Sequence, residues 1–212
     1  MKENDIRFAK LLILVNGAVP LALLVWDQSH RQLGANPQNF LILTTGMMTL
    51  IFLVLTLAVT PVRKITGWNW LLQIRRMLGL YAFFYGCLHF LCFFSLDRGF
   101  SLSGTLAEMV KRKYLIVGSS ALLVMVPLAV TSTNAMIKRL GGRRWRALHR
   151  LAYVAAVCGV THYYMQVKAD VRLPLAFAAV LGGLLGYRLW DRWRLARPLP
   201  IAPGSVEQKM NR

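Results

Sequence analysis

The sequence is poor in acidic residues and in cysteine, and this limits the chemistry that it can perform. Only 8 of its 212 residues are Asp or Glu, and its three cysteines, Cys87, Cys92 and Cys158, lie inside apolar runs without a C-x-x-C pair. We therefore interpret the cysteines as packing residues rather than metal ligands. Since the chain also lacks paired carboxylates, an activated nucleophile and a closed metal cluster, we do not expect it to catalyse bond chemistry itself.

Charge is missing from long stretches of the chain. Segments 40–60 and 77–96 contain no Asp, Glu, Lys or Arg, and 56% of all residues are hydrophobic. Uncharged runs of about 20 residues have the length of transmembrane helices, so the predicted fold class is an all-α integral membrane protein, a six-transmembrane-helix bundle. The first run has no clear cleavage site, and we expect it to be retained as a helix. The predicted spans are 8–26, 40–60, 77–96, 114–132, 148–166 and 173–190.

The positive charge is distributed unevenly between the loops. The chain has 26 Lys and Arg and a formal net charge of +18, but no basic segment interleaves with exposed aromatic residues, so we expect no nucleic-acid partner. Both terminal segments and the second and fourth loops hold 19 of the basic residues, and the other three loops hold 7. Because cytoplasmic loops collect Lys and Arg, we predict a multi-pass protein of the bacterial inner membrane with both termini cytoplasmic.

The spans leave little room for a second domain. We expect one membrane domain, residues 1–194, followed by a polar tail, residues 195–212, which contains several prolines and is expected to be disordered. The tail is too short for a flavin or nicotinamide domain. We therefore expect any electrons that the protein handles to come from a quinone or from a separate protein.

Two of the four histidines lie well inside apolar spans. His89 and His162 are in the third and fifth spans, where an ionisable residue is a functional candidate by default. The other interpretation is a neutral histidine that forms a hydrogen bond between helices. His30 lies in the first outer loop, and we interpret it as a solvated loop residue.

The two buried histidines are predicted to reach the same depth. His89 is twelve residues and His162 fourteen residues from the inner end of its span, which corresponds to about 18 and 21 Å. Two imidazoles on separate helices at one level are what a low-spin haem requires. Zinc or copper also binds imidazole but usually needs further ligands, whereas a porphyrin supplies four nitrogens.

The fourth histidine lies near the inner end of the fifth span. His149 precedes His162 by thirteen residues, a rise of about 19.5 Å that matches two stacked haems. The two side chains would point about 140° apart on a straight helix, so a shared face needs a bend, for which Gly159 is a candidate. With Arg143 and Arg144 close in sequence, His149 can also be an ordinary surface residue.

Several motifs along the chain form a recognisable pattern. The pattern resembles the haem-binding membrane subunit of the periplasmic protein-methionine-sulfoxide reductase system, the MsrQ family, which has a ferric-reductase-like transmembrane domain. The resemblance covers essentially the whole chain. The motifs are Leu33-Gly34-x-x-Pro37, Thr60-Pro61, Ile74-Arg75-Arg76-x-Leu78-Gly79-Leu80, Leu88-His89, Thr131-Ser132-x-x-Ala135-Met136, Leu140-Gly141, Trp145, Leu148-His149, Tyr153, His162-Tyr163 and Val167-Lys168.

The resemblance implies a b-type cytochrome that is the electron-transfer subunit of an oxidoreductase complex. Its electrons would come from the quinone pool or a cytoplasmic flavin reductase. They would pass to a periplasmic molybdopterin-containing subunit that repairs oxidised methionine in proteins. The family's haem-associated histidines match His89, His149 and His162, and FMN is a further cofactor associated with the family. One haem b is expected, and a second one stays open.

Two positions depart from the wider pattern. Related ferric reductases usually carry a second histidine on the third span, but the corresponding residue here is Arg75, which leaves His149 without an obvious imidazole partner. Arg75 and Arg76 can instead bind haem propionates or a flavin phosphate, or simply anchor the inner loop. Leu43 and Met47 stand where many members have His and Arg, so a quinone or partner contact at those positions is not carried over.

Two other functions remain open from sequence alone. A transmembrane ferric or cupric reductase would have the same fold and the same histidines. A small transporter or assembly factor would use the histidines structurally. A haem spectrum separates the last function from the others, and association with a periplasmic molybdoenzyme separates the first two.

The uneven basic charge leads to a test of topology. Reporter fusions at Pro198 are expected to lie in the cytoplasm and fusions near Gly104 in the periplasm, because positively charged loops stay inside. Alkaline phosphatase and green fluorescent protein fusions report the two sides. The opposite pattern would reverse the predicted orientation.

Overall fold

The computed structural model describes residues 3–196, and these residues form helices without any strand. Each predicted span corresponds to a helix, and shorter helices form two of the connections. Within the described residues the elements are α1 (Glu3–Ser29), α2 (Pro37–Thr66), α3 (Leu71–Cys92), the π-helix η1 (Phe93–Asp97), α4 (Leu102–Lys111), α5 (Lys113–Val130), α6 (Asn134–Leu140), α7 (Gly142–Leu148), α8 (Leu151–Gln166) and α9 (Arg172–Ala196).

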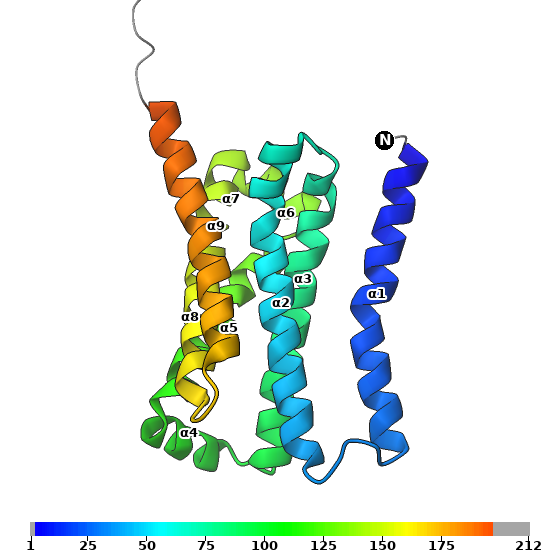
Figure 1. Cartoon of the computed structure of the whole chain (residues 1–212), viewed down its shortest axis with the longest axis vertical. Helices are drawn as coiled ribbons and strands as arrows, with labels where there is room; N and C mark the ends of the chain where they lie inside the picture. The colour runs from blue at the N-terminus through cyan, green and yellow to red at the C-terminus, as the bar shows by residue number, and fades with distance from the viewer. Residues whose placement is uncertain (1–2, 197–212) are drawn as a thin grey trace, which may run out of the picture.

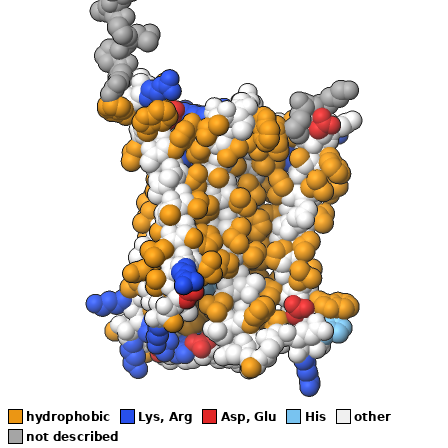
Figure 2. Space-filling model, viewed as in Figure 1, with side chains coloured by type: hydrophobic (Ala, Val, Ile, Leu, Met, Phe, Trp, Pro, Cys, Tyr) orange, Lys and Arg blue, Asp and Glu red, His pale blue; other side chains and the backbone are white. Residues whose placement is uncertain are grey.

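The helices show the composition of a multi-pass membrane protein. Among the described residues, α1, α2, α3 with η1, α5 and α9 are long and apolar enough to cross a bilayer. Apolar side chains cover the middle of the molecule, and charged side chains gather mainly towards its two ends (Figure 2). The sixth predicted span corresponds to α8, which has 16 residues and is shorter than the about 20 that a span needs. The prediction of six spans therefore stays a prediction.

The helices pack as two principal pairs. The most extensive helix contacts join α2 to α3 and α5 to α8, and α9 packs on α2 and α8. Figure 1 shows α4 lying across one end of the bundle, with α6 and α7 near the other end. The start of α1 and the end of α9 lie at the same end of the molecule as α6 and α7 (Figure 1). We call the two ends the α4 end and the α7 end.

Helix α1 stands beside the bundle and is attached through α3. The Tyr81 hydroxyl donates to the Leu14 carbonyl at 2.5 Å, and the buried Tyr85 hydroxyl donates to the Gly17 carbonyl at 2.7 Å. A Cβ at Gly17 would lie 2.6 Å from the Tyr81 ring, so only glycine lets the two helices approach this closely. These contacts hold α1 to α3 by backbone carbonyls rather than by a large apolar interface.

A proline in α2 creates the attachment point of α9. Pro61 has no N–H and cannot donate to the Leu57 carbonyl one turn earlier. The Arg188 guanidinium of α9 donates to this carbonyl instead, and also to the Tyr153 hydroxyl of α8 at 2.6 Å. Arg188 lies over the Tyr153 ring, 5.0 Å from its centroid. One arginine thus links three helices near the α7 end.

The structure corrects the expected fifth span. The predicted helix over 148–166 is wrong at its start, because α7 ends at Leu148 and α8 begins at Leu151, with His149 and Arg150 forming a turn. Gly159, the candidate for a bend, lies within the continuous α8, and the chain turns at His149 and Arg150 instead. His149 and His162 therefore belong to different segments. Most of the expected disordered tail, 197–212, lies outside the described residues, and α9 continues to Ala196.

Removal of the Arg188 side chain should loosen α9. Arg188→Leu leaves the Leu57 carbonyl and the Tyr153 hydroxyl without their donor, and an unsatisfied buried polar group costs about 1–3 kcal/mol. We expect a lower midpoint of thermal unfolding in detergent. Arg192→Leu, on the exposed face of the same helix, is the matched control. Equal midpoints for the two variants would contradict the linking role of Arg188.

Candidate functional site

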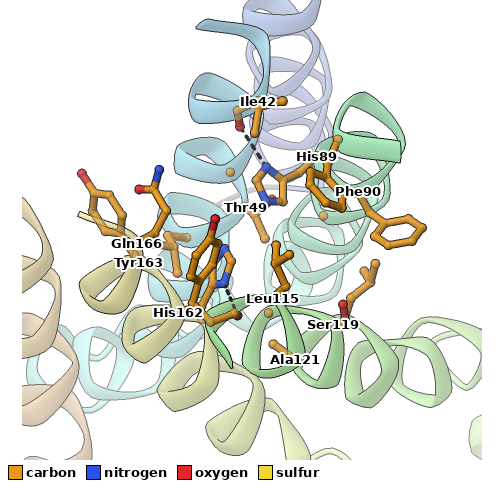
Figure 3. Close-up of a pocket in the computed structure, with 18 of the residues that line it drawn as sticks. Ile42, Thr49, His89, Phe90, Leu115, Ser119, Ala121, His162, Tyr163 and Gln166 are labelled. Atoms are coloured by element: carbon orange, nitrogen blue, oxygen red, sulfur yellow. Dashed lines mark hydrogen bonds between the residues drawn. The ribbon is translucent and has the colours of Figure 1, made fainter. Parts of the chain in front are cut away.

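His89 of α3 and His162 of α8 face each other inside the bundle. Their ring centroids are 6.0 Å apart, and the ring planes are inclined at 79°. Figure 3 shows both side chains pointing into a shared cavity. Two imidazoles that bind one metal from opposite sides have centroids about 6 Å apart, since each metal–nitrogen bond is about 2 Å. The structure thus brings together the two histidines that were predicted to lie at the same depth.

The outer edge of each imidazole is fixed by a backbone carbonyl. His89 Nδ1 lies 2.8 Å from the Ile42 carbonyl of α2, and His162 Nδ1 lies 2.7 Å from the Tyr114 carbonyl of α5. A carbonyl only accepts, so each Nδ1 is the donor and each Nε2 keeps its lone pair. Metal-bound histidines are held in this way, with the other ring nitrogen donating to a carbonyl or carboxylate.

We call the space around the two rings the paired-histidine cavity. Its volume is about 420 Å³, within the range of small-molecule sites, and α2, α3, α5 and α8 all line it. Most of the lining is apolar, and polar side chains gather where the cavity reaches the α4 end. These polar side chains are Asn39, Asp97, Arg112, Tyr114 and Gln166.

The donor set of this cavity fits haem. No group of three or more His, Cys, Asp or Glu side chains with metal-ligand geometry occurs among residues 3–196. Two neutral imidazoles are too few for most zinc or copper sites. They suffice for haem iron, because the porphyrin provides the other four ligands.

His149 lies in a second cavity, which we call the His149 cavity. Its volume is about 250 Å³. His149 Nε2 lies 3.1 Å from the Thr131 hydroxyl, and the ring stacks on Trp145 with centroids 3.9 Å apart. The Trp145 Nε1 donates to the Thr131 carbonyl at 2.9 Å. The chain has four histidines, and His30 lies exposed at the far end of α1, so no second imidazole is available to His149.

The two arginines predicted to bind an anion differ in their surroundings. Both line the His149 cavity. Arg76 is exposed and donates to the Asn134 side chain at 2.5 Å. Arg75 is half-buried. Its positive charge lies close enough to Arg188 to repel that side chain, and it also disfavours a positive charge on His149. Among the described residues that line this cavity none is acidic, so Arg75 has no carboxylate there.

The two cavities share part of their walls. Leu53 of α2 and Met125 of α5 line both, and both side chains are buried. An apolar layer that includes these two side chains therefore separates the paired-histidine cavity from the His149 cavity. Of the predicted site residues, the structure joins His89 with His162 and places His149, Arg75 and Arg76 together at the other site.

Several residues of the site were missed from the sequence. The acceptor carbonyls of Ile42 and Tyr114 have no sequence signal, because every residue carries a carbonyl. Gly46 and Gly118, over which the histidine rings lie, have a signal in retrospect as glycines in the interior of a span. Arg188 also could have been noted, since charged residues are rare within an apolar helix.

Comparison with known families defines the class of this protein. Residues 43–160 match the family described as "Ferric reductase like transmembrane component". This segment contains His89 and His149 and ends two residues before His162. No solved structure matches the chain.

Curated relatives narrow this class to one family. The chain is 47% identical over 97% of its length to "Protein-methionine-sulfoxide reductase heme-binding subunit MsrQ" of Ralstonia nicotianae, and the match covers 96% of that protein. The proteins of the same name from Herminiimonas arsenicoxydans and Rhodospirillum rubrum are 45% and 49% identical over 90% and 89% of the chain, and 88% and 90% of those proteins are covered. The chain therefore belongs to the MsrQ family, as its motifs predicted.

Proposed function

We propose that the protein is the b-type cytochrome subunit of a protein-methionine-sulfoxide reductase system and carries electrons across the inner membrane. The observation that supports this most directly is the pair His89 and His162, with ring centroids 6.0 Å apart and both Nδ1 atoms tied to carbonyls. Their free Nε2 atoms would hold one haem b. When bound there, haem supplies reversible one-electron chemistry.

The direction of transfer follows from the proposed topology. With both termini cytoplasmic, the polar rim of the paired-histidine cavity faces the periplasm. Asn39, Arg112 and Gln166 then lie where a periplasmic partner can approach. We propose that this partner is the molybdopterin-containing catalytic subunit, as the family resemblance implies. The electron donor would be the quinone pool or a cytoplasmic flavin reductase.

The His149 cavity would receive electrons on the cytoplasmic side. A second haem with two histidine ligands does not fit its residues, because the one remaining histidine, His30, lies exposed at the far end of α1. Its features suit an anionic cofactor with an aromatic part, such as FMN. Arg75 can bind a phosphate or carboxylate bidentately, and the stacked Trp145 and His149 offer aromatic surface.

The histidine variants are expected to separate the two cavities. His89→Ala and His162→Ala should each abolish the low-spin haem, because one remaining imidazole cannot keep six-coordinate iron. His149→Ala should leave most of that signal and alter only a cofactor near the α7 end. Reduced-minus-oxidised spectra with haem quantified per chain measure this.

Each histidine variant must first accumulate in the membrane at the wild-type level. His30→Ala, in the exposed loop, is the control and should keep the full spectrum. Wild-type haem content in both His89→Ala and His162→Ala would overturn the ligand assignment. Electron transfer itself is tested by reduction of the purified catalytic partner in proteoliposomes that contain quinol or a flavin reductase.

Arg75 and Arg76 provide a matched pair for the second cavity. Arg75→Lys should lower the amount of flavin or anionic cofactor that co-purifies by about tenfold, since lysine cannot form the bidentate contact and loses one charge-assisted hydrogen bond. Arg76→Lys should change it little, because Arg76 is exposed and is already bonded to Asn134. Flavin fluorescence after denaturation quantifies the cofactor. Equal cofactor retention in the two variants would contradict a cofactor contact of Arg75 and leave it only the role of anchoring the inner loop.

A further inference from the structure

The two histidines are held by the same construction in two different helix pairs. His89 of α3 reaches the Ile42 carbonyl of α2, and its ring lies over Gly46, four residues further along α2. His162 of α8 reaches the Tyr114 carbonyl of α5, and its ring lies over Gly118, again four residues further along. Each ring therefore uses a carbonyl and the glycine that follows it by one helical turn.

Helix geometry explains why the glycine must stand at this spacing. A side chain in an α-helix leans over the preceding turn, so the residue at position i+4 covers the carbonyl of residue i. With glycine at i+4 the carbonyl is open to a donor from another helix. One lone pair of that oxygen accepts the helical N–H of the glycine, and the second can accept the imidazole Nδ1–H.

We propose that Gly46 and Gly118 are positioning residues for the two haem-ligating imidazoles. By leaving the Ile42 and Tyr114 carbonyls accessible, they set both the place of each ring and the nitrogen that it presents to the cavity. This inference rests on the proposed haem role of His89 and His162. The two glycines would act through the histidine rings that they contact, and not by binding the iron themselves.

The two glycines differ in how closely the rings approach. A Cβ at Gly118 would lie 2.6 Å from His162 Nδ1 and 2.8 Å from its Cε1, which real Cβ atoms do not tolerate. A Cβ at Gly46 would lie 3.0 Å from His89 Nδ1 and Cε1, a tight contact that a shift of a few tenths of an ångström relieves. Alanine at position 118 must therefore displace its ring further than alanine at position 46.

The first experiment measures the haem site. Gly118→Ala should lower haem retention by at least about tenfold, as loss of an outer-shell contact to a metal-binding histidine does, and Gly46→Ala should lower it less. Remaining haem should show more high-spin absorption and a shifted midpoint potential. Gly183→Ala in α9, where a Cβ would meet nothing within 4 Å, is the matched control and should leave spectrum and potential unchanged.

The second experiment uses haem-free protein and so does not depend on the proposed function. Alanine is normally a better helix former than glycine, so replacing a helical glycine that has no steric role by alanine should stabilise the protein. Gly118→Ala should nevertheless lower the thermal midpoint of the His162 protein. In a His162→Ala background, where the ring is gone, the same change should be neutral or raise the midpoint. If the double variant of Gly118 and His162 does not accumulate, the same comparison can be made with Gly46→Ala in the wild-type and His89→Ala backgrounds.

The outcomes separate the two proposals. Equal destabilisation by Gly118→Ala with and without the His162 ring, and the same result at Gly46, would overturn the positioning role. A wild-type spectrum and potential in Gly118→Ala would overturn it as well. If the wild-type protein binds no haem but the ring and the glycine remain coupled, the haem assignment fails while the steric arrangement stands.

Discussion

Inside a bilayer a polar side chain has no water to bond with, so its partner must come from the protein. The described helices meet this constraint largely with backbone carbonyls. His89 and His162 donate to carbonyls of neighbouring helices, Tyr81 and Tyr85 attach α1 in the same way, and Arg188 attaches α9. Acidic side chains, which could serve instead, are few in this chain and costly in hydrocarbon. Which carbonyls are open therefore sets where these side chains can join neighbouring helices.

A helical carbonyl becomes open through a local choice of residue. Pro61 removes the N–H that would occupy the Leu57 carbonyl, and Gly46 and Gly118 remove the side chains that would cover the carbonyls one turn earlier. Glycine and proline are tolerated in membrane helices because neighbouring helices satisfy the backbone groups that they release. Here the neighbouring groups that do so are the side chains of His89, His162 and Arg188. The same few positions thus bear both on helix packing and on the orientation of the two imidazoles.

The sequence predicted the helical class and the meeting of two histidines because both depend on simple periodic quantities. Uncharged length locates a span, and a rise of about 1.5 Å per residue locates His89 and His162 at one level. It could not predict the break between α7 and α8 at His149, because no glycine or proline marks that turn. Nor could it reveal that the α2–α3 and α5–α8 pairs hold their histidines in the same way. The shared feature is a glycine four residues after the residue whose carbonyl accepts the hydrogen bond, and a residue of any type can supply that carbonyl.

The separation of the two cavities by Leu53 and Met125 bears on what can cross the protein. An ion entering this layer would lose its hydration without gaining a polar partner, because the two side chains are apolar and buried. An electron is not excluded in this way, since it passes between redox groups without carrying a solvation shell through the barrier. Each cavity, by contrast, holds polar side chains: His89 and His162 line one, and Arg75 and His149 line the other. A bundle divided in this manner is suited to moving electrons across a membrane that must stay closed to ions.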